Sequence, residues 1–300
     1  MKIVFMGSPE FAIPSLEKLL NSNHTVELVV SAPDKERGRG KKLLPTPVKE
    51  FALSKGLKVL SPISLKEENF IKQLKEINPD LFVVVAFRIL PQDVFTIPSK
   101  GSFNLHASLL PKYRGAAPIQ WALINGEKET GVTTFFLEEK VDTGNIILQE
   151  KIEIEDEDNF GTLHDKLMIL GADVVLKTVE LINTGNYELI KQDDSLASPA
   201  PKITKEICRI DWSKSAIEIH NLVRGLSPHP CAFFEHNGKI YKVYKTKVVE
   251  NRNLEQSKIH QTKKEIFVGT SSGAIQILEL QMEGRKRMSA EEFLRGYSLL

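Results

Sequence analysis

The sequence predicts a doubly wound, mostly parallel α/β sheet followed by a smaller β-barrel domain. Short apolar runs alternate with helical periods through residues 1–184. The run at 80–87 is apolar on both faces, as expected for a strand inside a parallel sheet. Beyond residue 207 the pattern changes to short strands at close spacing, which is typical of a small barrel.

In the first part of the chain, strands and helices are expected to alternate. We expect strands at 2–7, 25–32, 57–62, 80–87, 101–108, 130–139 and 144–154, and helices at 11–20, 64–78, 117–127 and 162–184. The segment 34–47 is glycine-rich and basic, and it is expected to be a mobile loop. In such folds ligands bind at the carboxyl ends of the strands.

The later part of the chain has a different organisation. The polar segment 185–207 is expected to be a linker, which separates a catalytic domain at 1–184 from a barrel domain at 208–300. In the barrel domain we expect a helix and proline turn within 211–230, strands at 233–237, 239–249, 265–270 and 274–281, and a closing helix at 288–296. The expected architecture is therefore two domains joined by a short connection.

Composition limits the class of protein. The chain has 300 residues, with 41% hydrophobic and 26% charged, which is typical of a soluble globular protein with a sizeable core. Its two cysteines, Cys208 and Cys231, are far apart, which argues against a metal site and favours a reducing cytoplasm. The apolar run at the N-terminus is too short for a signal peptide, and no later apolar run reaches the roughly 18 residues of a membrane span, so we expect neither.

Three polar residues are candidates for catalysis. Asn104 and His106 are two residues apart in an expected strand, so their side chains point to the same side. An amide donor beside an imidazole suits an oxyanion forming at a carbonyl carbon, and the carboxylate of Asp142 can orient the imidazole or carry protons. The alternative interpretation is structural, with a hydrogen-bonded core histidine and an aspartate that only makes a turn.

The segment 35–42 is a candidate nucleic-acid contact. It holds five basic residues against one acidic residue, a local charge of +4 on a chain of net charge +1. Its basic residues include Arg37, Arg39, Lys41 and Lys42. A solvated linker is the alternative interpretation. Lysines and arginines at 239–247 and 285–287 form a second, weaker candidate face.

The flanking sequence resembles that of the folate-dependent formyltransferases over nearly the whole chain. The matching pieces are MGSPEF (6–11), APDKERGRGKKL (32–43), PTPVK (45–49), VVVAF (83–87), NLHASLLPKYRGAAPIQWALINGE (104–127), TGVT (130–133), VDTGNII (141–147), RIDW (209–212) and RKRMSAEEFL (285–294). The central run and VDTG are the most specific pieces. The basic loop and the C-terminal pieces select the branch that acts on tRNA.

The resemblance implies a Rossmann-like catalytic domain, an OB-like barrel that binds tRNA, and roles for particular residues. The family's catalytic Asn, His and Asp fall on Asn104, His106 and Asp142, and its tRNA-contacting loop arginine falls on Arg39. The folate-contacting segment falls on Ser108, Leu109, Leu110 and Pro111. The implied reaction moves the formyl group of 10-formyltetrahydrofolate to the α-amino group of methionyl-initiator tRNA through a tetrahedral oxyanion, without a metal. A cytoplasmic monomer is implied.

The chain departs from many members of the family at AFRILP (86–91), a turn that lines the pterin pocket in the family and is one residue shorter here, with Arg88 in its middle. Two other functions stay open. One is formylation of another amine, an amino-sugar nucleotide or a purine-pathway ribonucleotide. The other is RNA binding without catalysis on the same scaffold.

Overall fold

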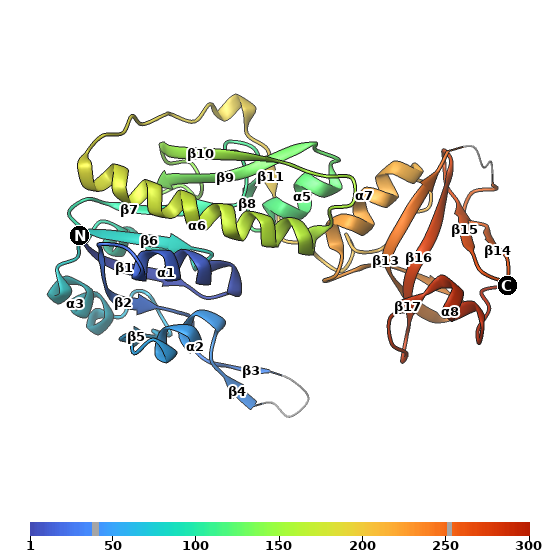
Figure 1. Cartoon of the computed structure of the whole chain (residues 1–300), viewed down its shortest axis with the longest axis horizontal. Helices are drawn as coiled ribbons and strands as arrows, with labels where there is room; N and C mark the ends of the chain where they lie inside the picture. The colour runs from blue at the N-terminus through green and yellow to red at the C-terminus, as the bar shows by residue number, and fades with distance from the viewer. Residues whose placement is uncertain (38–41, 251–253) are drawn as a thin grey trace. The chain divides into compact units, whose positions relative to one another are not determined.

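The computed structural model describes residues 1–37, 42–250 and 254–300 (Figure 1). The chain forms two compact units. Unit 1 comprises Met1–Gly115, Gly131–Ile152 and His164–Pro199, and unit 2 comprises Ala116–Thr130, Glu153–Leu163 and Ala200–Leu300. No helix in the described ranges has the length and apolar character that a membrane span needs.

The elements before residue 185 include the expected alternation. The strands are β1 (Lys2–Gly7), β2 (Thr25–Val30), β3 (Lys35–Arg37), β4 (Lys42–Leu44), β5 (Val59–Leu60), β6 (Leu81–Val85), β7 (Ser102–His106), β8 (Arg114–Gly115), β9 (Glu129–Phe136) and β10 (Ile146–Glu153). The helices are α1 (Ile13–Leu20), α2 (Pro47–Ser54), α3 (Glu68–Ile77), α4 (Gln92–Phe95), α5 (Pro118–Ile124) and α6 (Phe160–Thr184). Helices α2 and α4 and strands β3 and β4 are additions to the expected elements.

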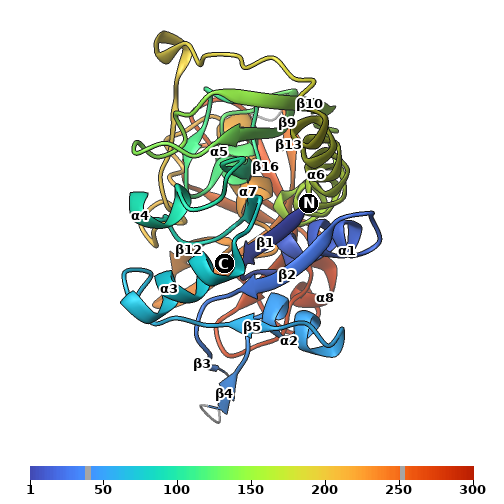
Figure 2. The ribbon, with the colours of Figure 1, turned by 90° about the vertical axis from the view of Figure 1, so that its left-hand side faces the viewer.

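The main sheet of unit 1 has seven strands in the order β10-β9-β7-β6-β1-β2-β5. Strands β7, β6, β1, β2 and β5 are parallel neighbours, while β9 joins β7 in antiparallel fashion. Figure 2 shows the sheet from β10 at the top to β5 near the bottom, with β3 and β4 projecting beyond it. Because β6 and β7 are adjacent and parallel, the loops that follow them lie at the same edge of the sheet.

Helix α6 packs closely on the sheet at one glycine. A Cβ atom at Gly171 would lie 2.7 Å from Leu105 Cδ2, so the helix approaches the centre of β7 where a larger side chain would collide. Leu105 is buried against α6, and the alternation of a strand therefore directs Asn104 and His106 to the opposite face. The position of α6 thus determines which face of β7 is free for a site.

The later elements lie mostly in unit 2. They are β11 (Pro199–Ala200), α7 (Ala216–Leu226), β12 (Ala232–His236), β13 (Lys239–Val249), β14 (Ile259–Gln261), β15 (Ile266–Gly269), β16 (Ala274–Met282), β17 (Met288–Ser289) and α8 (Ala290–Leu294). Helices α7 and α8 both begin with a capping box, Ser215 with Glu218 and Ser289 with Glu292. Strands β12 to β16 form a curled antiparallel sheet in the order β12-β13-β16-β15-β14, with β17 on β16.

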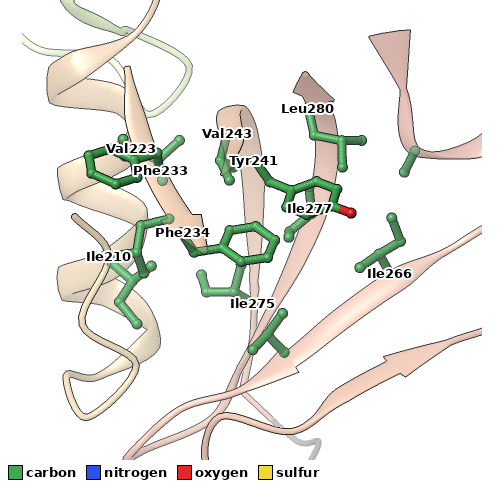
Figure 3. Close-up of a cluster of buried hydrophobic side chains, with 14 of the residues drawn as sticks. Ile210, Val223, Phe233, Phe234, Tyr241, Val243, Ile266, Ile275, Ile277 and Leu280 are labelled. Atoms are coloured by element: carbon green, nitrogen blue, oxygen red, sulfur yellow. The ribbon is translucent and has the colours of Figure 1, made fainter. Parts of the chain in front are cut away.

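The antiparallel sheet of unit 2 curls around one apolar core. In Figure 3, Val223 of α7 and Phe233, Phe234, Tyr241 and Ile277 of the sheet converge on this core. The rings of Phe234 and Tyr241 stack, with centroids 5.2 Å apart and planes 13° from parallel. The two architectures confirm the predicted fold class, a mostly parallel α/β sheet followed by an OB-like antiparallel barrel.

Candidate active site

Strand β7 carries two of the three expected catalytic side chains. His106, at its end, is 6% exposed, and Asn104 is half-buried. Asn104 lies opposite Phe135 of β9 and Val84 of β6, which hold the strand on both sides. Among the described residues, none forms a hydrogen bond with the Asn104 side chain, so its amide is available to a bound molecule.

The two ring nitrogens of His106 have different environments. Nε2 lies 2.8 Å from the carbonyl oxygen of Tyr113. A carbonyl only accepts hydrogen bonds, so Nε2 carries a proton and donates it. Neutral imidazole has one N–H, and the other nitrogen, Nδ1, therefore lacks a proton until His106 becomes an imidazolium. Nδ1 lies 3.9 Å from Asp142 Oδ2, and it is the nitrogen that remains for chemistry.

The structure brings Asp142 to His106 from the turn between β9 and β10. Its side chain is 12% exposed, and Oδ2 accepts a hydrogen bond of 2.9 Å from the backbone N–H of Gly115. Asp142 adopts a φ of 58°, a left-handed conformation that aspartate tolerates better than most residues. The carboxylate is thus held beside the imidazole by Gly115 of β8.

The segment Ser108–Pro111, expected to contact folate, makes hydrogen bonds with neighbouring residues of the protein. Thr133 Oγ1 donates to the carbonyl of Ser108 (2.6 Å) and accepts from the N–H of Leu110 (3.1 Å). Ser108 and Leu110 are buried, and the Ser108 hydroxyl donates to the carbonyl of Lys112. Leu109 and Pro111 are half-buried. The serine hydroxyl is thus engaged within the protein.

Arg88, in the turn after β6, is directed to a neighbouring loop. Its guanidinium donates to the carbonyls of Pro62 (2.8 Å) and Ile63 (2.9 Å) in the loop after β5. Burial lowers the pKa of Arg88, and the charge of Glu67 opposes that shift. The side chain therefore joins two loops at the carboxyl edge of the sheet. Ile89, beside it, is 73% exposed.

The expected tRNA-binding residues belong to the segment that forms β3 and β4. The two strands pair as a short antiparallel hairpin, Lys35 with Leu44 and Arg37 with Lys42, where a loop was expected. Lys42 is exposed. Arg39 and Lys41 lie outside the described residues, as does the side chain of Arg37.

Sequence reasoning missed two residues that support the site, Arg114 and Gln192. Gln192 lies in the segment expected to be a linker, yet it is 7% exposed and hydrogen-bonded to the loops that carry Arg114 and Asp142. Arg114 sits in the KYRG motif, which was a usable signal, whereas an isolated glutamine in a polar segment gives none. In the described ranges, no group of three or more His, Cys, Asp or Glu side chains is arranged to hold a metal ion.

Comparison with known proteins gives consistent matches over the whole chain. The formyl transferase family profile matches residues 1–179, and the profile of the formyl transferase C-terminal domain matches residues 202–298. A methionyl-tRNA formyltransferase from Caldanaerobacter subterraneus subsp. tengcongensis is 48% identical over 302 residues, covering 100% of this chain and 98% of its own. One from Flavobacterium johnsoniae is 48% identical over 302 residues, covering 99% of this chain and 96% of its own.

Solved structures with the same fold are more distant in sequence. A sugar 3N-formyl transferase crystallised with dTDP and 5-N-formyl-THF matches with a TM-score of 0.70 at 23% identity, covering 95% of this chain and 99% of its own. An N-formyltransferase from Helicobacter canadensis, crystallised with folinic acid and dTDP-3-aminofucose, matches with a TM-score of 0.69 at 22% identity, covering 96% of this chain and 100% of its own. At these identities the likeness is one of fold.

Proposed function

The chain belongs to the formyl transferase family, and from that premise we propose that it transfers the formyl group of 10-formyltetrahydrofolate to the α-amino group of methionyl-initiator tRNA. Relatives named methionyl-tRNA formyltransferase, 48% identical over nearly their whole length, support this acceptor. The observation that carries the chemistry is the 3.9 Å approach of Asp142 Oδ2 to His106 Nδ1, beside the unbonded amide of Asn104.

Asn104 and His106 would stabilise the oxygen of the transferred group. Attack by an amine makes the formyl carbon tetrahedral and its oxygen negative. The Asn104 amide donates to that oxygen directly. His106 donates from Nδ1 only as an imidazolium, since its Nε2–H is engaged by the Tyr113 carbonyl. The Asp142 carboxylate lies 3.9 Å from that nitrogen.

Asp142 would handle the protons. An α-amino group has a reference pKa of about 7.7–8, and a neighbouring ester lowers it, so the neutral nucleophile is present near pH 7. After attack the amine loses a proton, and the folate nitrogen gains one as it leaves. A carboxylate beside the imidazole can relay this proton directly or through water.

The folate would bind at the carboxyl edge of β6 and β7. The exposed Ile89 and the half-buried Leu109 and Pro111 offer apolar contacts suited to a flat ring, and the buried Ser108 and Leu110 fix the shape of that loop. Arg88 would support this edge by holding the turn after β6 against the loop after β5.

The basic hairpin and the barrel would hold the tRNA. We assign catalysis to residues 1–184, a connection to 185–207 whose first part, up to Pro199, belongs to the catalytic unit, and tRNA binding to 208–300, with Arg37, Arg39, Lys41 and Lys42 as additional tRNA contacts. We also propose a cytoplasmic monomer. The cytoplasmic location is supported by the tRNA substrate, which is used in protein synthesis. Light scattering of the purified protein tests whether it is a monomer.

The test is formyl transfer measured with three acceptors. Methionyl-initiator tRNA should be formylated rapidly from 10-formyltetrahydrofolate, whereas an amino-sugar nucleotide and a purine-pathway ribonucleotide should not. Transfer to one of the small-molecule acceptors, without transfer to the tRNA, would show that the acceptor is that small molecule and not tRNA. Binding of the charged tRNA without any formyl transfer would identify an RNA-binding protein and overturn the proposal.

A further inference from the structure

Gln192 has every hydrogen-bonding capacity of its side chain engaged. Its amide nitrogen donates to the carbonyls of Asp142 (3.0 Å) and Gly144 (2.8 Å). Its amide oxygen accepts from Arg114, at 3.1 Å from Nε and 2.8 Å from the terminal nitrogen Nη2. A glutamine amide offers two N–H groups and two lone pairs, so this set is complete. The partners also fix its orientation, because a flipped amide would face oxygen with oxygen.

The bonds of Gln192 reach the backbone on both sides of the catalytic pair. The Asp142 carboxylate belongs to the turn whose backbone carbonyls accept hydrogen bonds from Gln192. It accepts from Gly115, the residue after Arg114. Tyr113, on the other side of Arg114, supplies the carbonyl that binds His106. Gln192 therefore braces the segment at 113–115 against the turn at 142–144, and both segments contact the imidazole or the carboxylate.

Two further contacts hold the segment that carries Gln192 in place. Ile190 pairs with Ile146 of β10 through two backbone hydrogen bonds of 2.8 and 3.0 Å. Ser198 binds the N–H groups of Tyr113 and Arg114, each at 2.9 Å. The outer ion pair of Arg114 with Asp194 contributes little, since the Asp194 side chain is 80% exposed. The brace is therefore built from the hydrogen bonds of the buried Gln192 amide, two to neutral backbone carbonyls and two from the Arg114 guanidinium.

We propose that Gln192 is a positioning residue for formyl transfer, holding the turn at 142–144 so that the Asp142 carboxylate faces Nδ1 of His106. Asp142 has a φ of 58°, a conformation that costs free energy for a residue other than glycine and that persists where the surroundings impose it. The two hydrogen bonds to the carbonyls of residues 142 and 144 impose it. This inference rests on the proposed role of Asp142 and adds a residue that does not touch the substrates.

The test combines Gln192→Glu with Asp142→Asn in a double-mutant cycle. Gln192→Glu keeps the acceptor for Arg114 and loses the two N–H donors. The bonds to Arg114 therefore remain, while the turn at 142–144 loses both of its hydrogen bonds to residue 192. We expect kcat to fall about 10- to 100-fold, the scale of a misplaced catalytic group, while KM for both substrates stays unchanged. In the Asp142→Asn background the same change should cost no more than about twofold, because its effect passes through Asp142.

The control is Thr178→Val. Thr178 is fully buried and its hydroxyl makes two hydrogen bonds away from the site, with Thr134 and the Val174 carbonyl. The Thr178→Val substitution should lower the stability of the protein and leave kcat unchanged. If Gln192→Glu fails to fold, Gln192→Met, of similar volume and without charge, takes its place in the cycle.

The outcomes separate this inference from the proposed function. Losses that multiply in the double variant, or wild-type kcat in the Gln192 variant, would overturn the positioning role alone. A wild-type rate in Asp142→Asn would overturn the catalytic role of Asp142 and the positioning role with it. Absence of formyl transfer by the unmodified protein would overturn the proposed function itself.

Discussion

His106 shows how one backbone contact decides the chemistry of a side chain. The spacing of Asn104 and His106 indicated a shared strand face, but nothing in the sequence predicted which ring nitrogen would be free. The Tyr113 carbonyl engages Nε2, so Nδ1 faces the Asp142 carboxylate. Because neutral His106 cannot donate from Nδ1, the amide of Asn104 is the one donor of the pair that acts in both protonation states.

The first prediction concerns Asn104. Asn104→Ala should lower kcat about 100- to 1000-fold, because removing one oxyanion donor costs about 2.7–4 kcal/mol of transition-state stabilisation. Affinity for methionyl-initiator tRNA, measured by filter binding, should stay unchanged. Ser102→Ala on the same strand, which loses a hydroxyl bonded to the Phe95 carbonyl, is the matched control and should retain its turnover. Wild-type turnover in Asn104→Ala would remove the oxyanion role.

The second prediction concerns the glycine of VDTG. A Cβ atom at Gly144 would lie 1.7 Å from the carbonyl oxygen of Phe136, so Gly144→Ala must displace the turn that carries Asp142. We expect a loss of about 1–3 kcal/mol in unfolding free energy by urea titration, together with reduced kcat. Gly296→Ala meets no atom within 4 Å and should change neither quantity. An unchanged Gly144→Ala enzyme would show that the turn can move without consequence.

At the scale of elements, the sequence predicted those strands and helices whose burial pattern is simple. Strand β6 is buried at every position and was identified by its apolar run. Helix α3 begins four residues later than expected, at Glu68, and the residues before it form a turn in which Ser64 N–H donates to the Glu67 carboxylate. Residues 190–198 gave no signal, since their contacts with the site are long-range bonds of polar side chains and backbone that have no periodicity.

The third prediction concerns helix α7. Burial, and then the charge of Arg224, lower the pKa of His220, while Glu157 and Asp156 oppose the shift; its Nδ1 lies 2.9 Å from the Thr246 hydroxyl. A histidine with a lowered pKa binds protons less readily when folded than when unfolded. The contribution of neutral His220 to folding stability is therefore fully present above the unfolded pKa of about 6.5 and is lost as the pH falls below that value.

His220→Gln should remove part of this acid sensitivity. Thermal unfolding at a series of pH values from neutral to mildly acidic should show a smaller decrease in Tm for His220→Gln than for the unmodified protein. The exposed His260 provides the control, because His260→Gln should leave the pH dependence intact. Parallel curves for the His220 variant and the parent would contradict the assignment.

At the scale of the whole molecule, charge is local. The net charge is +1, so attraction to a polyanion comes from particular segments and not from the protein as a whole. Several cations of the barrel are already engaged: Lys245 pairs with Glu157 at 3.0 Å, and Arg287 pairs with Glu279 and stacks on Tyr244. The basic hairpin should therefore dominate the electrostatic part of tRNA binding.

The fourth prediction is the salt dependence of tRNA binding. If the five cations of residues 35–42 each displace one counterion, the logarithm of the association constant should fall against log salt with a slope of about −3.5 to −4.5. Arg39→Ala should make that slope shallower by about one and leave the affinity for folate unchanged, whereas Lys66→Ala, an exposed lysine elsewhere, should alter neither. A much steeper slope that survives Arg39→Ala would instead assign most phosphate contacts to the barrel. Equal losses for tRNA and folate would show that the hairpin supports the catalytic unit and does not contact RNA.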